Sequence, residues 1–329
     1  MCNVGIDVGS KELVMVIRHK GKNHKARSFN NTPEGHAQIV KTLSSKKGEV
    51  RVCLEATGIY HFDLAVALSR SNTLKVMIVN PKAARHFAVA LMTRSKTDQV
   101  DANVLAQYAE IMPFEAWQVP SDKVLELRAF SRRIAALTKL KVQTKNQLHA
   151  LQSSVSVPEI ILEETQASIE FFEMQIQRLK EHALTLIGSE ETLQRTLEII
   201  TSIKGIAESS AIQLLGELLI LPKDMNNRQW VAFAGLDPRH YQSGTSVSKK
   251  PRISKAGNSY LRQALYMPAL CASRRDPYVS AYYQHLIENQ GLKKMQAVCA
   301  VMRKLLHAIH AMLKNETHFD STRFFNMAA

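Results

Sequence analysis

Apolar residues in the first third of the chain fall into short runs separated by amphipathic stretches. The runs predict strands over residues 3–8, 13–19, 25–29, 50–55 and 74–79. Helical spacing of apolar residues predicts helices over about 33–45, 59–71, 81–91 and 99–111. Thr32 followed by Pro33 marks the start of the first helix. This order favours an α/β fold in which an antiparallel meander joins a mixed sheet.

The pattern becomes helical after Trp117. Residues 122 to about 187 contain no glycine and predict long helices, broken near Pro158. Their apolar positions step by three and four at Ile169, Phe172, Ile176, Leu179, Ala183 and Leu186. This seam fits a coiled coil or a helical hairpin, and it could pack within one chain or join two chains. We favour oligomerisation.

The last region, from about 193 onward, is expected to be mainly helical, so the fold class is α/β plus all-α. Ile203 to Ala207 resembles a helix-hairpin-helix turn, although Ala207 stands where that motif usually has a second glycine. A plain turn between two helices is the alternative interpretation. A polar loop is expected over 241–246. The chain is therefore divided into domains at 1–117, 118–190 and 191–329.

Four acids stand at the ends of predicted elements. Asp7 and Glu55 end apolar strands, where a charge is unfavourable unless something binds it. Asp98 and Asp101 lie three apart at a helix start and share one face. If the four converge, their mutual repulsion calls for a cation, and Mg²⁺ with its oxygen ligands is the natural one. Two Mg²⁺ ions about 3.5–4 Å apart could then hold both oxygens of a phosphoryl transfer.

Each acid also has an ordinary explanation. Asp7 could be a turn residue, and acids in a first helical turn are favoured by the helix dipole. The string from Gly5 to Ser10 also opens actin-like ATPases and sugar kinases. Those proteins need a second glycine-rich phosphate loop, which this sequence lacks. The metal-ligand interpretation of Asp7, Glu55, Asp98 and Asp101 is therefore preferred.

Composition points to a polyanionic partner. The chain carries a formal net charge of +14, and Lys and Arg occupy three stretches without any acid, at 64–97, 127–158 and 238–275. A solvated basic face is the ordinary alternative for one such stretch, but three favour contacts with a phosphate backbone. The predicted nucleic-acid contacts are Arg94, Lys96, Arg128, Arg132, Arg133, Arg239, Lys249, Lys250, Arg252 and Lys255.

The cysteines and the termini add little chemistry. Cys2, Cys53, Cys271 and Cys299 form no CxxC pair, which argues against disulfides and zinc and fits a reducing compartment. No signal peptide and no membrane-spanning run are recognised. A cytoplasmic protein with no membrane partner is expected.

Ser243 lies beside Gly244 within the third acid-free stretch. A serine hydroxyl is a weak nucleophile unless a base or a metal activates it. On sequence alone, a turn serine is the ordinary explanation, and Thr245, Ser246 and Ser248 compete for any catalytic role.

An ordered set of short strings resembles one family. In the first half they are Gly5-Ile6-Asp7-Val8, Leu54-Glu55-Ala56-Thr57-Gly58, Val79-Asn80-Pro81, Lys96-Thr97-Asp98 and Val100-Asp101-Ala102. In the second half they are Phe233-Ala234-Gly235-Leu236, Tyr241-Gln242-Ser243-Gly244, Ser254-Lys255-Ala256-Gly257 and Leu265-Tyr266-Met267-Pro268-Ala269. Together they resemble the DEDD transposases of the IS110 and IS1111 insertion sequences, relatives of the Piv DNA invertase.

The resemblance implies a RuvC-like, ribonuclease H-like N-terminal domain, a coiled-coil middle and a C-terminal transposase domain. It implies Asp7, Glu55, Asp98 and Asp101 as Mg²⁺ ligands and Ser243 as the nucleophile. It further implies a homo-oligomer, dimer or tetramer, that recombines donor and target DNA through phosphoserine intermediates. A structured noncoding guide RNA would direct it in the nucleoid of a prokaryote. The alternative function is a RuvC-like Mg²⁺-dependent nuclease or Holliday-junction resolvase.

Overall fold

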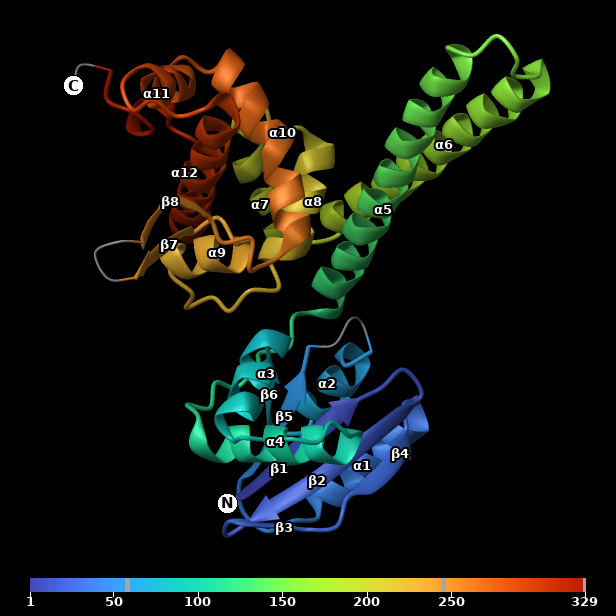
Figure 1. Cartoon of the computed structure of the whole chain (residues 1–329), viewed down its shortest axis with the longest axis vertical. Helices are drawn as coiled ribbons and strands as arrows, with labels where there is room; N and C mark the ends of the chain where they lie inside the picture. Colours follow the sequence, from blue (N-terminus) through green and yellow to red (C-terminus); the bar gives the residue numbers. More distant parts are fainter. Residues whose placement is uncertain (57–59, 244–246, 328–329) are drawn as a thin grey trace. The chain divides into compact units, whose positions relative to one another are not determined.

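The computed structural model describes residues 1–56, 60–243 and 247–327, and for residues 240, 243 and 247–250 it describes the backbone alone. The chain divides into two compact units, Met1–Val119 and Pro120–Ala329 (Figure 1). Each unit is described by itself below. The division into three domains stays a prediction.

The first unit is built on one mixed six-stranded sheet. Its strands are β1 (Cys2–Val8), β2 (Glu12–His19), β3 (Lys22–Asn23), β4 (Arg27–Asn30), β5 (Val50–Glu55) and β6 (Leu74–Val79). Their order is β3-β2-β1-β5-β6, and β4 also pairs with β2. β1 is antiparallel to β2 and parallel to β5, and β5 is parallel to β6. This is the ribonuclease H-like arrangement that the sequence predicts.

Helices cover both faces of this sheet. They are α1 (Pro33–Ser44), α2 (Phe62–Ser69), α3 (Pro81–Ala90) and α4 (Asp98–Ile111). Thr32 caps α1 by accepting a hydrogen bond from the Gly35 amide, as predicted. α1 and α2 share a core with alternate residues of β1, including Val4 and Ile6. α4 crosses the opposite face, in front of β1 and β2 in Figure 1.

The second unit begins with two long helices, α5 (Asp122–Gln152) and α6 (Glu159–Gly188). They pack side by side as a hairpin (Figure 1). α5 also packs against α8 and α6 against α7, and the far end of the hairpin projects from this unit. Ile169, Ile176 and Ala183 of the predicted seam are buried. The seam is thus used within the chain, and oligomerisation stays a prediction.

The rest of the second unit is a helical core. It contains α7 (Glu191–Thr201), α8 (Glu208–Leu218), α9 (Asn227–Ala234), α10 (Ser259–Arg275), α11 (Pro277–Glu288), α12 (Lys294–Asn315) and the 3₁₀ turn η1 (Ser321–Arg323). Gly205, in the turn between α7 and α8, has φ +108°, and a Cβ there would meet the backbone of Pro268 and Ala272 in α10. The glycine thus serves close packing of this turn against α10.

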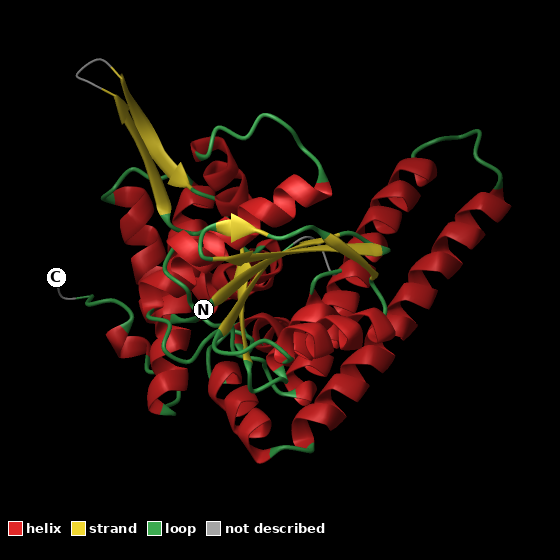
Figure 2. Cartoon of the chain, turned by 90° about the horizontal axis from the view of Figure 1, so that it is seen from below, coloured by secondary structure: helices red, strands yellow, loops and turns green. Residues whose placement is uncertain are grey.

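Two strands interrupt the helices. β7 (Pro238–Ser243) and β8 (Val247–Ile253) form an antiparallel ribbon that projects from the helices in Figure 2. The prediction of a loop over residues 241–243 was wrong. These strands lack an alternating apolar face because they pair only with each other. Among the described helices, none combines the length and apolarity needed to cross a membrane.

Candidate active site

Asp7 and Glu55 end two neighbouring parallel strands. The register pairs Gly5 with Cys53 and Ile6 with Leu54, so Asp7 and Glu55 are the next residues on β1 and β5. Alternation places Gly5 and Asp7 on the face of β1 opposite to buried Val4 and Ile6. Cys53, two residues before Glu55, packs with Leu105 and Ala109 of α4. Both acids therefore stand on the α4 face.

Helix α4 brings the other two acids to the same place. A Cβ on Gly5 would overlap the carbonyl oxygen of Ala102 and the amide of Ala106, so α4 lies directly on β1. Thr97 caps this helix by accepting from the Val100 amide, which fixes Asp98 and Asp101 in its first turn. That turn lies over the end of β1, where Asp7 stands.

The charges of the other three acids act on Asp7. The pKa of Asp7 is raised to about 6, first by burial and then by the negative charges of Asp98, Asp101 and Glu55, while a hydrogen bond from the Val8 amide opposes the rise. Burial and Asp98 also raise the pKa of Asp101, against the nearby positive charge of Lys96. Such a cluster is unfavourable unless a cation neutralises it.

The donor set fits a hard divalent cation. All four side chains offer carboxylate oxygens, the ligands preferred by Mg²⁺ and Ca²⁺ over softer metals. Within the described residues, no group of three acidic, histidine or cysteine side chains stands close enough to enclose an ion as it is. Asp98 is exposed, and Asp7, Glu55 and Asp101 are half-buried, so the side chains would have to turn inward to bind an ion.

Asn31 is a residue of this region that the sequence did not reveal. Its side-chain amide donates to the carbonyl oxygens of Gly9, at 2.9 Å, and Tyr60, at 3.2 Å. Its Oδ1 lies 2.7 Å from Nε2 of the buried His36. Asn31 thus ties together the segments that follow Asp7 and Glu55. Its place just before a helix cap made it look like an ordinary turn residue.

Ser243 lies at the last paired position of β7, opposite Val247 of β8. The side chains of Ser243 and of its competitor Ser248 lie outside what is described, as do the competitors Thr245 and Ser246. The base of the ribbon is well fixed. Ser254 donates its amide to the Asp237 carbonyl, at 2.8 Å, and its hydroxyl to Asp237 Oδ1, at 2.6 Å.

Two residues predicted to contact nucleic acid, Arg128 and Arg132, lie beside a protein carboxylate. Glu217 of α8 is fully buried, and Arg132 donates to both of its carboxylate oxygens, at 2.7 and 3.2 Å. Arg128 lies 3.8 Å from the same carboxylate, and Asn258 donates to it at 2.6 Å. These arginines neutralise a buried charge, and their contact with nucleic acid stays a prediction. Arg94, Lys96, Arg133, Arg239, Arg252 and Lys255 are exposed, and the side chains of Lys249 and Lys250 lie outside the described residues.

Comparison with known proteins identifies relatives along nearly the whole chain. Residues 4–155 match the model of the IS110 DEDD transposases, and residues 197–284 match the transposase family IS116/IS110/IS902. A pilin gene-inverting protein of Moraxella bovis is 30% identical over 96% of this chain and 97% of its own.

Shorter similarities also occur. A protein of insertion element IS110 from Streptomyces coelicolor is 27% identical over 37% of this chain and 30% of its own. The solved RuvC structure of Thermus thermophilus aligns with 35% of this chain and 99% of RuvC, at 17% identity and a TM-score of 0.28. With both halves matched in order and a relative aligned along nearly its whole length, the chain belongs to the IS110 family of transposases, enzymes that act on DNA.

Proposed function

We propose that this transposase is a Mg²⁺-dependent serine recombinase that cuts and rejoins DNA strands under the guidance of a structured noncoding RNA. The observation that carries the proposal is the convergence of Asp7, Glu55, Asp98 and Asp101 at the ends of β1, β5 and the first turn of α4. Acids on three separate elements have no packing reason to meet, and ion binding gives one.

Asp7, Glu55, Asp98 and Asp101 would hold the metal. When bound, Mg²⁺ would polarise the scissile phosphate and stabilise the charge that develops on its oxygens. The positions of the ligands on two strand ends and a capped helix keep them in place on rigid elements. Asn31 restrains the two segments that leave the strands.

Ser243 would supply the nucleophile. Its Oγ forms a bond to phosphorus, the bond from phosphorus to one deoxyribose oxygen breaks, and the serine proton is passed on while the leaving oxygen takes one up. The phosphoserine ester keeps the bond energy, so a deoxyribose hydroxyl of the other duplex can reverse the step and rejoin the strands without ATP. The fixed ribbon base at Asp237 and Ser254 supports a presenting role for this segment.

The Moraxella bovis relative favours recombination over simple hydrolysis. Its name states that it inverts a pilin gene, and inversion requires that cut strands be rejoined in a new order. The net charge of +14 supports a polyanionic partner, and we assign it to donor DNA, target DNA and guide RNA. The protein would act in the prokaryotic cytoplasm, at the nucleoid.

A trapping experiment tests the mechanism. The purified protein is incubated with Mg²⁺, RNA transcribed from its flanking element and labelled target DNA, then denatured. A covalent protein–DNA adduct that maps to Ser243 and disappears in Ser243→Ala is expected. Asp98→Asn should abolish cleavage and leave DNA and RNA binding largely intact. Continued cutting by Ser243→Ala without an adduct would favour the RuvC-like nuclease or Holliday-junction resolvase.

The oligomer can be tested with the same substrate. Mixed oligomers of Asp7→Asn and Ser243→Ala subunits should regain cleavage if the acids of one subunit act with the serine of another. Each variant alone should be inactive. Sites confined to single subunits would leave the mixture inactive as well.

A further inference from the structure

The edge of the sheet contains a hollow of about 270 Å³ that the proposed reaction does not use. β4 pairs with β2 as far as Met15, and β3 pairs with it from Arg18 onward. Between these pairings the chain runs irregularly from His24 to Ala26, and only the His24 amide bonds back to β2, at the Ile17 carbonyl. This gap in the ladder opens the hollow, which we call the edge pocket.

The edge pocket lies on the face of the sheet opposite to the carboxylates. Asp7 pairs with Val14, and cross-strand partners point to the same face. Met15 and Ile17 belong to the other set of alternating residues, and they pack in the core beneath α1 and α2. The edge pocket is therefore a second site, separated from the acids by the thickness of the sheet.

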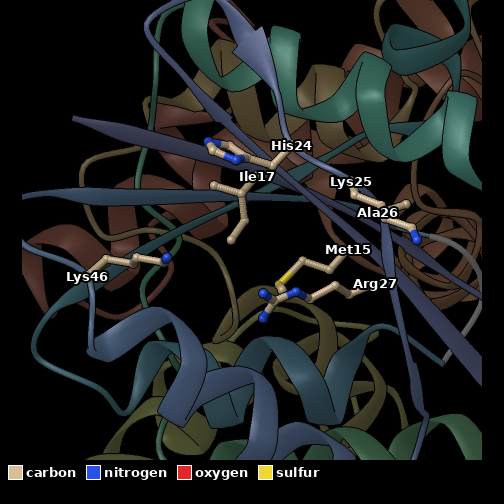
Figure 3. Close-up of a pocket in the computed structure, with 7 residues that line it drawn as sticks. All are labelled: Met15, Ile17, His24, Lys25, Ala26, Arg27 and Lys46. Carbon is tan, nitrogen blue, oxygen red and sulfur yellow. The ribbon is translucent and has the colours of Figure 1, made fainter.

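Its lining combines an apolar floor with cations. Met15 is almost fully buried and Ile17 is half-buried, so the floor is a fixed part of the core. Figure 3 shows the Lys46 ammonium and the Arg27 guanidinium directed toward the hollow from opposite sides, while Lys25 extends away from it. The lining residues are Met15, Ile17, His24, Lys25, Ala26, Arg27 and Lys46, and they include no acid.

The cations are available to a ligand. None of the ion pairs found within the described part of the chain includes Arg27 or Lys46. A ligand that suits the pocket must carry negative charge for these two groups and a flat apolar part for the half-buried Ile17. A nucleotide has both. The volume lies just under the range of about 300–1,000 Å³ typical of small-molecule pockets, which suits one nucleotide.

We propose that the edge pocket binds one nucleotide of a single-stranded nucleic acid, with its base against Ile17 and its phosphate between Arg27 and Lys46. A base inside a duplex is stacked and paired, so it cannot lie against a protein surface. A single strand exposes its bases and keeps its phosphates. This inference requires no role for Ser243.

The test compares two double variants of the full-length protein. Arg27→Gln/Lys46→Gln removes both pocket cations. Lys22→Gln/Lys47→Gln removes two exposed lysines from the same unit and serves as the charge-matched control, because neither lines the pocket. Affinity for a labelled single-stranded oligonucleotide is measured between 50 and 300 mM salt, in separate RNA and DNA arms.

The pocket variant should bind roughly tenfold more weakly. Its plot of log affinity against log salt should flatten by about 0.7, since the two cations share one phosphate and each phosphate contact on a single strand contributes about that much. The control should retain the wild-type slope to within about half of that change. If the pocket variant loses more affinity for the RNA oligonucleotide than for the DNA one, the pocket binds RNA. The opposite result assigns it to DNA. Equal losses in both double variants would overturn the proposal and indicate a diffuse basic face.

Photocross-linking places the base. An oligonucleotide carrying 4-thiouracil or 5-iodouracil should cross-link to the peptide containing Met15 and Ile17, and the cross-link should be lost in Arg27→Gln/Lys46→Gln. Cross-links confined to other peptides would contradict the site. Vesicles containing phosphatidylserine form a further arm. If the pocket variant loses vesicle binding and keeps oligonucleotide binding, the ligand is a lipid headgroup and the proposal fails.

Discussion

Gly5 of β1 lies directly beneath Ala102 of α4, so close that a Cβ on Gly5 would overlap the Ala102 carbonyl oxygen. This contact sets how near α4 approaches the sheet, and with it how near Asp98 and Asp101 come to Asp7. Gly5 is extended rather than left-handed, so its requirement is space and not backbone conformation.

Gly5→Ala should therefore separate α4 from β1. We expect a loss of about 1–3 kcal/mol in the free energy of unfolding, measured by urea titration, because backbone atoms cannot yield as side chains do. Mg²⁺-dependent cleavage should fall further than the fraction folded. Gly188→Ala is the matched control, since a Cβ there meets nothing and no loss is expected. Equal effects at both positions would contradict the packing argument.

Asp7→Asn should stabilise the metal-free protein at pH 7.5. The pKa of Asp7 in the folded state is about 6, above the ordinary 3.8, so ionisation disfavours the folded state. As pH falls from about 7 toward 4, Asp7 takes up its proton in the folded state before it does so in the unfolded state. The contribution of Asp7 to wild-type stability should therefore rise over this range. The gain from Asp7→Asn should thus vanish below about pH 4.

Thermal unfolding across this pH range measures the effect. Added Mg²⁺ should raise the Tm of the wild type at pH 7.5 and leave Asp7→Asn nearly unchanged, because ion binding stabilises only the state that binds it. A variant with the same pH profile as wild type would show that Asp7 does not experience the neighbouring charges.

Glu217→Gln should destabilise the second unit strongly. The change leaves Arg132 and Arg128 beside a neutral side chain in a buried site, which typically costs about 3–5 kcal/mol. Glu173→Gln is the control, since that carboxylate is 46% exposed and its pair with Lys145 should be worth under about 1 kcal/mol. Chemical denaturation measures the free energy of unfolding of both variants. Similar small losses in Glu217→Gln and Glu173→Gln would argue against a shared buried network around Glu217.

Asn31→Ala should loosen the segments after Asp7 and Glu55 without unfolding the sheet. We expect Mn²⁺, used as a paramagnetic probe, to bind several-fold more weakly by electron paramagnetic resonance, and cleavage to fall in parallel. Asn30→Ala is the neighbouring control, because residue 30 contributes its backbone to β4. Unchanged Mn²⁺ affinity in Asn31→Ala would show that Asn31 does not position the acids for metal binding.

Local sequence pattern was sufficient to predict most strands and helices of the first unit and to single out the four acids. The apolar runs of β1 and β5 and the helix start at Thr32 and Pro33 are recorded in adjacent residues, so local pattern predicted them. The β7–β8 ribbon was partly missed because its strands bury no apolar face. Asn31 was missed because its partners, Gly9 and Tyr60, lie 22 and 29 residues away.

The sequence by itself thus determined the strands, the helices and the presence of four acids at their ends, because hydrophobic periodicity records which side of each element is buried. The tertiary structure alone decided which residues meet. Arg132 pairs with the buried Glu217 of α8, 85 residues further along the chain, and no local pattern predicted that pairing. The edge pocket exists only because β3 and β4 leave a gap beside β2. Contacts of this kind depend on how elements pack, and the spacing of residues along one element carries no record of them.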